Sequence, residues 1–394
     1  MNKQWISILG STGSIGQSTL DVVALHPERF GVFALTAYRQ ADVLMQQIRR
    51  FRPRMVVVVD EAAAAAVADR VKAEGLSTSV ASGGAHLSAV ASHPDVDIVM
   101  AAIVGAAGLF PCLAAASSGK KILLANKEAL VVGGHFFMQA VRDGGATLLP
   151  IDSEHSAIFQ SLPEDSNTWR DRVQKLILTA SGGPFRNREP SSLRCVTPQE
   201  ACAHPNWVMG RKISVDSATM MNKALEVIEA HHLFQLPAGQ IEVVIHPQSV
   251  IHSMVQYKDA SVVCQMGSPD MKVPIAYGLS WPDRMASGAA VLDFASMPAL
   301  TFEKPDPHRY PCLQFAWTAL AGPIGSTAVL NAANEIAVDA FLQGRLRFDQ
   351  IYNLIEDVML LMEHPSAGSL DAVVAMDVEA RAKANQWVHT RSAG

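Results

Sequence analysis

The sequence predicts an α/β fold: a parallel sheet covered by helices on both faces, then a mixed α+β region, then a bundle of helices. Three observations support this order. Short aliphatic runs alternate with alanine-rich helical stretches over residues 1–150. The stretch at about 181–211 has no regular periodicity, and from residue 312 apolar residues recur at helical spacing. Alternating strands and helices are typical of a parallel sheet, and a period near 3.6 residues is typical of helices.

Composition limits the class of protein. The chain has 394 residues, more than one hydrophobic core usually supports, so several domains are expected. A hydrophobic fraction of 49% and a charged fraction of 18% are those of a globular protein. The net charge of -5 and the lack of a basic run give no reason to expect a nucleic-acid partner. The five scattered cysteines favour a reducing, cytoplasmic location.

We expect neither a targeting signal nor a membrane partner. The first residues run directly into a strand pattern, without the apolar core of a signal peptide. One long apolar stretch, at 98–116, is interrupted by Gly105, Gly108 and Pro111. Glycine and proline at such short intervals predict a buried strand, a turn and the start of a helix.

A glycine-rich turn follows the first strand. The apolar run at 5–9 is followed directly by Gly10, Gly13 and Gly16, at intervals of three. Glycines at a strand-to-helix turn let the backbone approach a pyrophosphate, and the free N–H groups at the helix start bind its charge. The pattern predicts a Rossmann-like dinucleotide-binding domain over residues 1–150. An ordinary strand-to-helix turn is the alternative.

The second strand indicates which dinucleotide is bound. NAD sites usually have an acid near the end of this strand, where it binds the ribose hydroxyls. Here the strand at 31–37 is followed by Tyr38-Arg39-Gln40, with no acid and one guanidinium. An arginine attracts the 2′-phosphate that an acid would repel, so NADPH is favoured over NADH. A solvated surface charge at Arg39 is the alternative.

Polar segments follow two later strands. Asn126-Lys127-Glu128 comes after the run at 121–124, and Asp152-Ser153-Glu154 comes after the run at 146–149. Because ligands of parallel sheets bind at the carboxyl ends of strands, both segments are expected at one crevice. In extended structure Asp152 and Glu154 would point the same way, and two such close charges repel unless a cation lies between them. We therefore expect a divalent cation beside the cofactor.

The region 151–285 is expected to hold the chemistry. Its loop at about 181–211 contains Trp207, and long loops of this kind often act as lids that exclude water. The alternative is that Trp207 plugs a small separate core. The sheet pattern resumes at 241–255, where His246 and His252 are expected to be structural.

One helix in this region suits an anionic ligand. Ser217 or Thr219 can cap it, and Asn222, Lys223 and Glu226 then share one side. Ser217 and backbone amides would bind a phosphate, Lys223 would balance its charge, and Glu226 would bind a cation. A surface ion pair between Lys223 and Glu226 is the alternative.

Glu226 brings the number of candidate metal-binding carboxylates to three, with Asp152 and Glu154. Hard oxygen ligands fit Mg²⁺ or Mn²⁺, whereas zinc prefers nitrogen and sulfur.

Residues 286–311 are expected to be a linker, and residues 312–394 a helical domain. Its helices are expected at 312–320, 326–342, 348–362 and 369–387, with the polar run at 331–335 bridging helices or capping one.

These motifs together give the chain a resemblance to the 1-deoxy-D-xylulose 5-phosphate reductoisomerases, over essentially its whole length. The resemblance is carried by the glycine turn at 10–16, by 101–109, 124–128 and 152–155, by 181–185 and 204–207, and by 210–223 and 246–253. Tyr38-Arg39-Gln40 departs from the family pattern of glycine, lysine and asparagine. Arg39 keeps the charge for a 2′-phosphate.

The resemblance implies a role for each matching residue. Asp152, Glu154 and Glu226 would bind the metal. The substrate-binding residues would be Lys127, Ser153, Glu154, Ser181, His204, Ser217, Asn222, Lys223 and Glu226, and the catalytic ones Lys127, Glu154, His204 and Trp207. The NADPH contacts would be Thr12, Gly13, Ser14, Ile15, Asn126, Glu128 and Gly210, with Tyr38, Arg39 and Gln40 on the adenosine side.

The resemblance also implies a reaction. A divalent ion, Mg²⁺ or Mn²⁺, would polarise a small phosphorylated sugar, whose carbon skeleton rearranges by a retroaldol–aldol route or an α-ketol shift. NADPH would then reduce the resulting aldehyde. A homodimer is expected, as is usual for the family. The alternatives are another two-domain NADP oxidoreductase, such as a semialdehyde or homoserine dehydrogenase, and a redox-sensing regulator that keeps only the nucleotide half.

Overall fold

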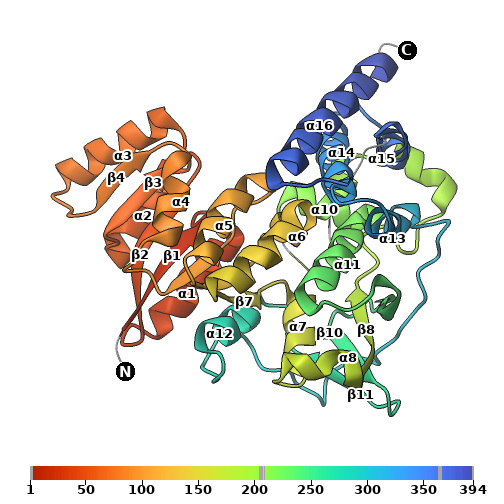
Figure 1. Ribbon diagram of the computed structural model, residues 1–394, viewed down its shortest axis with the longest axis horizontal. Coiled ribbons are helices and arrows are strands. Elements are labelled where there is room, and N and C mark those ends of the chain that lie inside the picture. The colour runs from red at the N-terminus through yellow and green to blue at the C-terminus, as the bar shows by residue number, and fades with distance from the viewer. Residues whose placement is uncertain (1–2, 204–206, 208, 363–365, 393–394) are drawn as a thin grey trace. The chain divides into compact units, whose positions relative to one another are not determined.

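The structure is a computed structural model that describes residues 3–203, 207, 209–362 and 366–392. The chain forms two compact units (Figure 1). The first unit comprises Met1–Ala129, Phe137–Ser156 and Asp270–Val291, and the second comprises Leu130–Phe136, Ala157–Pro269 and Leu292–Gly394. This division is coarser than the four parts expected from the sequence, which stay a prediction.

A seven-stranded parallel sheet forms the centre of the first unit, in the order β4-β3-β2-β1-β5-β6-β7. Most of its strands are apolar and buried because helices cover both faces, as in other parallel sheets, whereas the edge strand β4 is partly exposed. The fold class expected from the sequence is confirmed. The strands are β1 (Gln4–Leu9), β2 (Phe30–Ala37), β3 (Met55–Val58), β4 (Ser79–Ser82), β5 (Ile98–Ala101), β6 (Lys121–Leu124) and β7 (Thr147–Pro150).

Helices connect these strands. The apolar stretch at 98–116 is strand β5, a short turn and the start of a helix, as its glycines and proline predict. Among the described residues, no helix combines the length and the apolarity needed to cross a membrane. The helices are α1 (Ser14–Leu25), α2 (Ala41–Phe51), α3 (Glu61–Ala73), α4 (Ala85–Ser92), the 3-10 turn Ala106–Gly108, α5 (Leu109–Ser117), α6 (Lys127–Gly144), α7 (Ser153–Ser161) and α12 (Lys272–Ser280).

Helix α12 belongs to the first unit although it follows most of the second in sequence. It packs on β6 and β7, and Gly278 lies so close to this surface that a Cβ there would be 3.0 Å from side-chain atoms of Leu123 and Ile151. Lys121 fixes the end of α12, since its Nζ donates to the carbonyl of Leu279 at 3.0 Å. The return of the chain therefore completes the cover of the sheet near the strands that end at the candidate site.

A four-stranded mixed sheet lies in the second unit, in the order β11-β10-β8-β9. Strand β8 runs parallel to β9 and antiparallel to β10. The elements of the unit up to residue 269 are the 3-10 helix Ser166–Thr168, α8 (Trp169–Arg172), β8 (Val173–Ala180), the 3-10 helix Pro190–Cys195, α9 (Pro198–Ala201), α10 (Arg211–Thr219), α11 (Met221–Phe234), the 3-10 helix Ala238–Gln240, β9 (Ile241–Ile245), β10 (Ile251–Tyr257) and β11 (Val262–Met266).

The C-terminal helices share one hydrophobic core with α11 and β8. Helix α11 is apolar and buried over most of its circumference, which requires neighbours on several sides. The four helices expected here are found, with the last extending beyond its predicted end. They are α13 (Phe315–Ala321), preceded by the 3-10 helix Pro311–Gln314, then α14 (Ser326–Leu342), α15 (Gln350–Leu361) and α16 (Leu370–Ser392).

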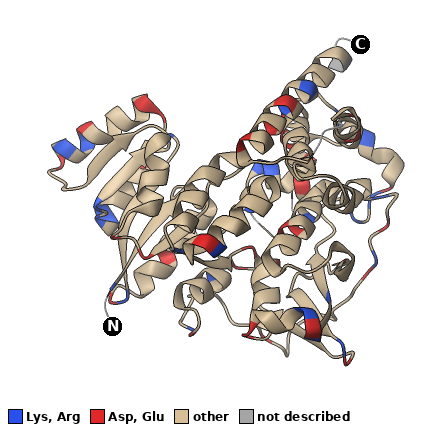
Figure 2. Ribbon diagram, viewed as in Figure 1, with Lys and Arg blue, Asp and Glu red and all other residues tan. Residues whose placement is uncertain are grey.

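Acidic and basic positions are interspersed along the described elements of both units (Figure 2). This distribution agrees with the absence of a basic run in the sequence. A phosphate-backbone partner would require basic side chains gathered on one face.

Candidate active site

The glycine turn after β1 has the close contacts that its sequence predicts. Gly10 has φ +83°, and a Cβ there would lie 2.6 Å from the carbonyl oxygen of Ala102. A Cβ on Gly16 would lie 2.5 Å from the carbonyl oxygen of Gly10. Helix α1 begins directly after Gly13 with no side-chain cap. The N-terminus of α1 can therefore receive a phosphate, since nothing of its own chain caps it through a side chain.

Tyr38, Arg39 and Gln40 lie at the carboxyl end of β2, as expected, and all three are exposed. Tyr38 is 63% exposed, a high value for a large aromatic residue. In folds of this kind, the adenosine of a bound dinucleotide lies at the carboxyl end of a parallel strand. The position is consistent with the predicted adenosine-side role.

Asn126 closes the end of β6. Its Oδ1 accepts a hydrogen bond from the N–H of Ala129 at 3.0 Å and so caps α6, and its Nδ2 donates to the carbonyls of Ile103 and Gly105. The same Nδ2 lies 3.2 Å from Oε2 of Glu128. One buried amide thus fixes the loop after β5, the start of α6 and a carboxylate. Asn126 therefore has a structural role in holding these segments together, besides any contact with the cofactor.

The predicted extended conformation of Asp152-Ser153-Glu154 is wrong. Strand β7 ends at Pro150, and Ser153 and Glu154 form the first turn of α7. An acid in a first turn is stabilised by the helix dipole, which accounts for the difference. The two carboxylates nevertheless lie close together, as expected, because oxygens of Asp152 and Glu154 are within 4.8 Å of each other. Oxygens this close can bind one cation.

Lys127 neutralises this pair of acids from the neighbouring strand end. Its Nζ lies 2.5 Å from Oδ2 of Asp152, and both side chains are largely buried. Burial raises the pKa of Asp152, but the charge of Lys127 and further contacts outweigh it and hold that pKa well below its usual range. Ser153 donates a hydrogen bond to Glu154 at 2.6 Å. The first unit thus brings together Lys127, Asp152, Ser153 and Glu154, as the sequence predicted.

Helix α11 of the second unit positions Asn222, Lys223 and Glu226 on one side. The amide of Asn222 and the ammonium of Lys223 both donate to the Glu226 carboxylate. Side-chain exposure is 4% for Lys223 and 1% for Glu226, so the alternative of a surface ion pair is wrong. Glu229, one turn further on, is also fully buried and was not predicted. The sequence did offer a signal for Glu229, because it is a glutamate one turn after Glu226 on a largely apolar helix.

The helix expected to begin near Ser217 is in fact two helices. Helix α10 ends at Thr219, Met220 has a left-handed φ of 62°, and α11 follows. Ser217 therefore lies in the last turn of α10 instead of capping α11. The hydroxyl of Thr219 accepts from the N–H of Met221 at 3.2 Å, but the N-cap position of α11 is Met220, and neither predicted residue caps the helix. A left-handed methionine has no recognisable sequence pattern, so the break could not be foreseen.

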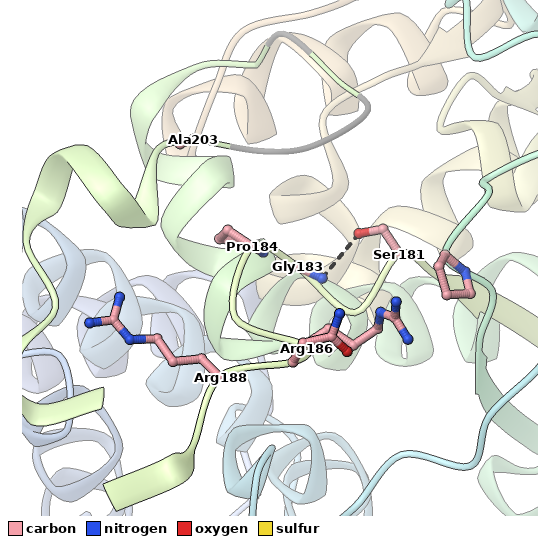
Figure 3. A pocket seen from close by; sticks show the side chains of 8 residues that line it. Ser181, Gly183, Pro184, Arg186, Arg188 and Ala203 are labelled. Atoms are coloured by element: carbon pink, nitrogen blue, oxygen red, sulfur yellow. Dashed lines mark hydrogen bonds between the residues drawn. The ribbon is translucent and has the colours of Figure 1, made fainter. Parts of the chain in front are cut away.

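Ser181 and Ser217 lie on adjoining backbone segments of the second unit. Gly182 and Gly183 have φ +84° and +69°, and a Cβ on Gly183 would lie 2.7 Å from the carbonyl oxygen of Ser217. The hydroxyl of Ser181 accepts a hydrogen bond from the N–H of Gly183 at 3.1 Å (Figure 3). Two glycines thus let the Ser181 loop approach the end of α10.

A cavity of about 560 Å³ opens beside Ser181. Arg186 and Arg188 line it, and neither was predicted, although two arginines just after a Gly-Gly-Pro turn were visible in the sequence (Figure 3). Arg186 pairs with Glu303 at 2.5 Å and Arg188 with Glu200 at 2.8 Å. The remaining lining residues are Gly183, Pro184, Asn187, Ala203 and Pro247.

Of the predicted lid residues, Trp207 is described and half-buried, with its ring 6.3 Å from that of His252. His204 lies outside the described residues. Gly210 directly precedes α10 and accepts from the Ser214 hydroxyl at 3.0 Å. His246 is structural, as expected, because its Nε2 accepts from the N–H groups of residues 250 and 251.

The first unit, with its parallel sheet, glycine turn and paired carboxylates, defines the class as a dinucleotide-binding enzyme equipped for a divalent cation. Family models match three segments that together make up most of the chain. Residues 6–134 match 1-deoxy-D-xylulose 5-phosphate reductoisomerase, residues 148–234 its C-terminal domain, and residues 266–383 the DXP reductoisomerase C-terminal domain. The chain belongs to the 1-deoxy-D-xylulose 5-phosphate reductoisomerase family, which confirms the resemblance seen in the sequence.

Individual relatives agree. The reductoisomerase of Ralstonia pickettii is 56% identical over 388 residues, 98% of each chain, and that of Cupriavidus pinatubonensis 58% over 379 residues, 96% of each. A crystal structure of DOX-P reductoisomerase in complex with NADPH, fosmidomycin and magnesium has a TM-score of 0.93 at 42% identity, covering 99% of this chain and 100% of that one. The Zymomonas mobilis enzyme in complex with NADPH has a TM-score of 0.91 at 44% identity, covering 98% and 99%.

Proposed function

We propose that Asp152, Glu154 and Glu226 bind the divalent cation of this reductoisomerase. The chain is an NADP-dependent enzyme of its family and converts 1-deoxy-D-xylulose 5-phosphate to 2-C-methyl-D-erythritol 4-phosphate, using NADPH and a divalent cation. The observation that supports the ligand set best is the approach of the Asp152 and Glu154 oxygens to within 4.8 Å. Like charges at this distance are stable only with a cation or a lysine between them.

The donor set fits a hard cation. All three proposed ligands are carboxylates, and the buried Glu226 is held by Lys223, which supplies a positive charge beside it. When bound, Mg²⁺ or Mn²⁺ would supply Lewis-acid polarisation of the substrate's carbonyl and hydroxyl oxygens. We propose either ion as competent, because oxygen ligands suit both.

Lys127 and Ser153 are proposed to contact the substrate near its reacting carbons. Lys127 is held by Asp152 at 2.5 Å, so its charge stays beside the metal ligands in a largely buried position. An ammonium fixed in this way can donate hydrogen bonds to a substrate oxygen as negative charge develops there. Ser153 lies next in the chain, at the start of α7, where backbone N–H groups favour anions. Glu154 is proposed to act beside them as both ligand and catalytic residue.

The substrate's phosphate is proposed to bind Ser181, Ser217, Asn222 and Lys223. Hydroxyl and amide groups supply directional hydrogen bonds, and Lys223 supplies charge. Supporting the assignment, the Ser181 loop packs against the backbone of Ser217. Binding energy from a phosphate remote from the reacting carbons can stabilise a closed lid. His204 and Trp207 are proposed to cover the substrate from that lid and to exclude water.

NADPH is proposed to bind along the first unit from Thr12, Gly13, Ser14 and Ile15 at the start of α1 to the adenosine side. There Arg39 would pair with the 2′-phosphate, flanked by Tyr38 and Gln40, because a guanidinium binds phosphate oxygens through two N–H groups. The proposed contacts nearer the nicotinamide are Asn126, Glu128 and, in the second unit, Gly210.

We also propose a homodimer and a cytoplasmic location. Strand β11 is an edge strand with Val262 and Val263 each nearly half exposed, and an exposed apolar edge strand is a template for pairing with another chain. All five cysteines are free, which suits a reducing compartment. Sedimentation of the wild type and of Val263→Lys tests the dimer: a dimer that becomes monomeric supports it, and a wild-type monomer contradicts it.

The activity is tested by NADPH oxidation. Metal-free protein with 1-deoxy-D-xylulose 5-phosphate should give no loss of NADPH absorbance until Mg²⁺ or Mn²⁺ is added. Absence of turnover with metal present would contradict the assignment. Ser153→Ala, tested beside the surface control Ser261→Ala, then asks whether the serine between the two acids contributes to KM for the sugar phosphate.

A further inference from the structure

A buried carboxylate lies beside Ser217 on α10. Asp216 is 1% exposed, and its Oδ1 accepts a hydrogen bond from Nδ2 of Asn334 at 2.9 Å. Its Oδ2 lies 2.9 Å from Nζ of Lys212, one turn earlier on the same helix. Asn334 belongs to α14, 118 residues further along the chain. Helix α14 is therefore hydrogen-bonded directly to α10, the helix that carries the proposed phosphate ligand Ser217.

Further polar contacts fix α14 itself. Glu335 accepts from Asn331 at 3.2 Å and pairs with Arg381 of α16 at 2.7 Å, and Arg381 also pairs with Asp377 at 2.6 Å. Asn331 and Asn334 are both fully buried. Buried amides cost free energy unless they are bonded, so apolar residues would pack here at a lower cost. Polar groups retained in such a core can fix the register of the helices.

The register of α10 matters because Ser217 lies in its last turn. A Cβ on Gly183 would already lie 2.7 Å from the carbonyl oxygen of Ser217, so the Ser181 loop fits against α10 without spare room. A shift of α10 along its axis would displace both serines relative to Asn222 and Lys223 on α11. Misplacing substrate-orienting groups by about 1 Å can cost on the order of a hundredfold in rate.

We propose that Asp216 and Asn334 are positioning residues for the substrate's phosphate group. The hydrogen bond between them holds α10 in register with α14 and so fixes Ser217. This inference rests on the proposed role of Ser217 as a phosphate ligand. It gives the C-terminal helices a part in substrate affinity in addition to their part in the core.

The test compares Asn334→Ala with Asn331→Ala in the steady-state kinetics of the full-length enzyme. The two asparagines are equally buried on one helix, but only Asn334 bonds to α10, so Asn331→Ala is the matched control for lost packing. Loss of a hydrogen bond to a charged group should raise KM for the sugar phosphate about tenfold in Asn334→Ala. KM for NADPH should not change. The same sugar-phosphate KM in both variants would overturn the proposal.

A second pair of variants applies even if Asn334→Ala fails to fold. Asp216→Asn keeps an oxygen that can accept from Asn334, whereas Asp216→Leu does not. KM for the sugar phosphate should stay near the wild-type value in Asp216→Asn and rise in Asp216→Leu. Equal KM values in the two variants would overturn the proposal.

Ser217→Ala distinguishes this inference from the proposed function. If Ser217 binds the phosphate, Ser217→Ala raises KM for the sugar phosphate. Adding Asn334→Ala to that variant then raises KM by a smaller factor than Asn334→Ala does in the wild type. That non-additivity is expected because Asn334 acts through Ser217. An unchanged KM in Ser217→Ala would refute the phosphate role itself. Full additivity in the double variant would refute only the positioning role.

Discussion

Replacing Lys127 by methionine removes the charge that faces Asp152 and keeps most of the apolar stem. The two groups lie 2.5 Å apart, with side-chain exposures of only 9% and 16%. Removing one member of a buried ion pair typically costs about 3–5 kcal/mol, because the other charge loses its compensation. We expect metal-free Lys127→Met to lose about 3 kcal/mol of unfolding free energy, the lower end of that range, since neither group is fully buried.

Urea unfolding in EDTA, followed by circular dichroism, measures this loss. Lys127→Met/Asp152→Asn removes both members of the ion pair and should recover about 2 kcal/mol of it, because Asp152 no longer carries an uncompensated charge. Lys175→Met is the control, since its pair with Glu242 is half exposed and should contribute less than about 1 kcal/mol. Equal stability of wild type and Lys127→Met, or a double variant no more stable than the single one, would refute the reasoning.

The same variants also test the proposed cation. A divalent ion bound by Asp152 and Glu154 would compensate the charges that Lys127 no longer balances. Added Mn²⁺ should therefore raise the unfolding midpoint of Lys127→Met by more than it raises that of the wild type. No difference between the two increments would contradict metal binding at this pair.

Two further predictions concern the cofactor and pH. Gly16→Ala should weaken NADPH binding at least about tenfold in a fluorescence titration, because its Cβ would lie 2.5 Å from the carbonyl oxygen of Gly10; unchanged affinity would contradict the close packing of the turn. Burial, with smaller contributions from His231 and His135, lowers the pKa of His232 to about 3. As pH falls below about 6.5, His232 therefore becomes protonated in the unfolded chain but not in the folded one. The free energy of unfolding should drop by about 2 kcal/mol by pH 5. His232→Gln should remove this drop in unfolding free energy, whereas His231→Gln should not. Equal slopes of unfolding free energy against pH in the two variants would contradict the assignment to His232.

The sequence predicted the parallel sheet well because its strands are buried on both faces. Continuous apolar runs such as 55–59 and 122–124 then mark strands clearly. It failed at Ser153 and Glu154, since two acids separated by one residue fit a strand end and a helix start equally well. It also missed the break at Met220, because nothing in the residue type signals a left-handed backbone at a methionine.

The candidate site was predictable to different degrees. The grouping of Lys127, Asp152 and Glu154 followed from a general rule, that the ends of parallel strands meet at one edge. The burial of Glu226 did not, because spacing alone cannot distinguish a buried pair with Lys223 from an exposed one. The Asn334–Asp216 bond joins residues 118 apart in sequence, and no local pattern predicts such a pair.

The central claim, that Glu226 shares one cation with Asp152 and Glu154, is tested most directly by Mn²⁺ binding. Titration calorimetry of the full-length protein with NADPH present would compare wild type, Glu226→Gln, Asp152→Asn and the exposed control Glu242→Gln. We predict that the first two variants lose at least about tenfold in Mn²⁺ affinity, while the control and the NADPH affinity of all four proteins stay unchanged. Wild-type Mn²⁺ affinity in Glu226→Gln would contradict the claim.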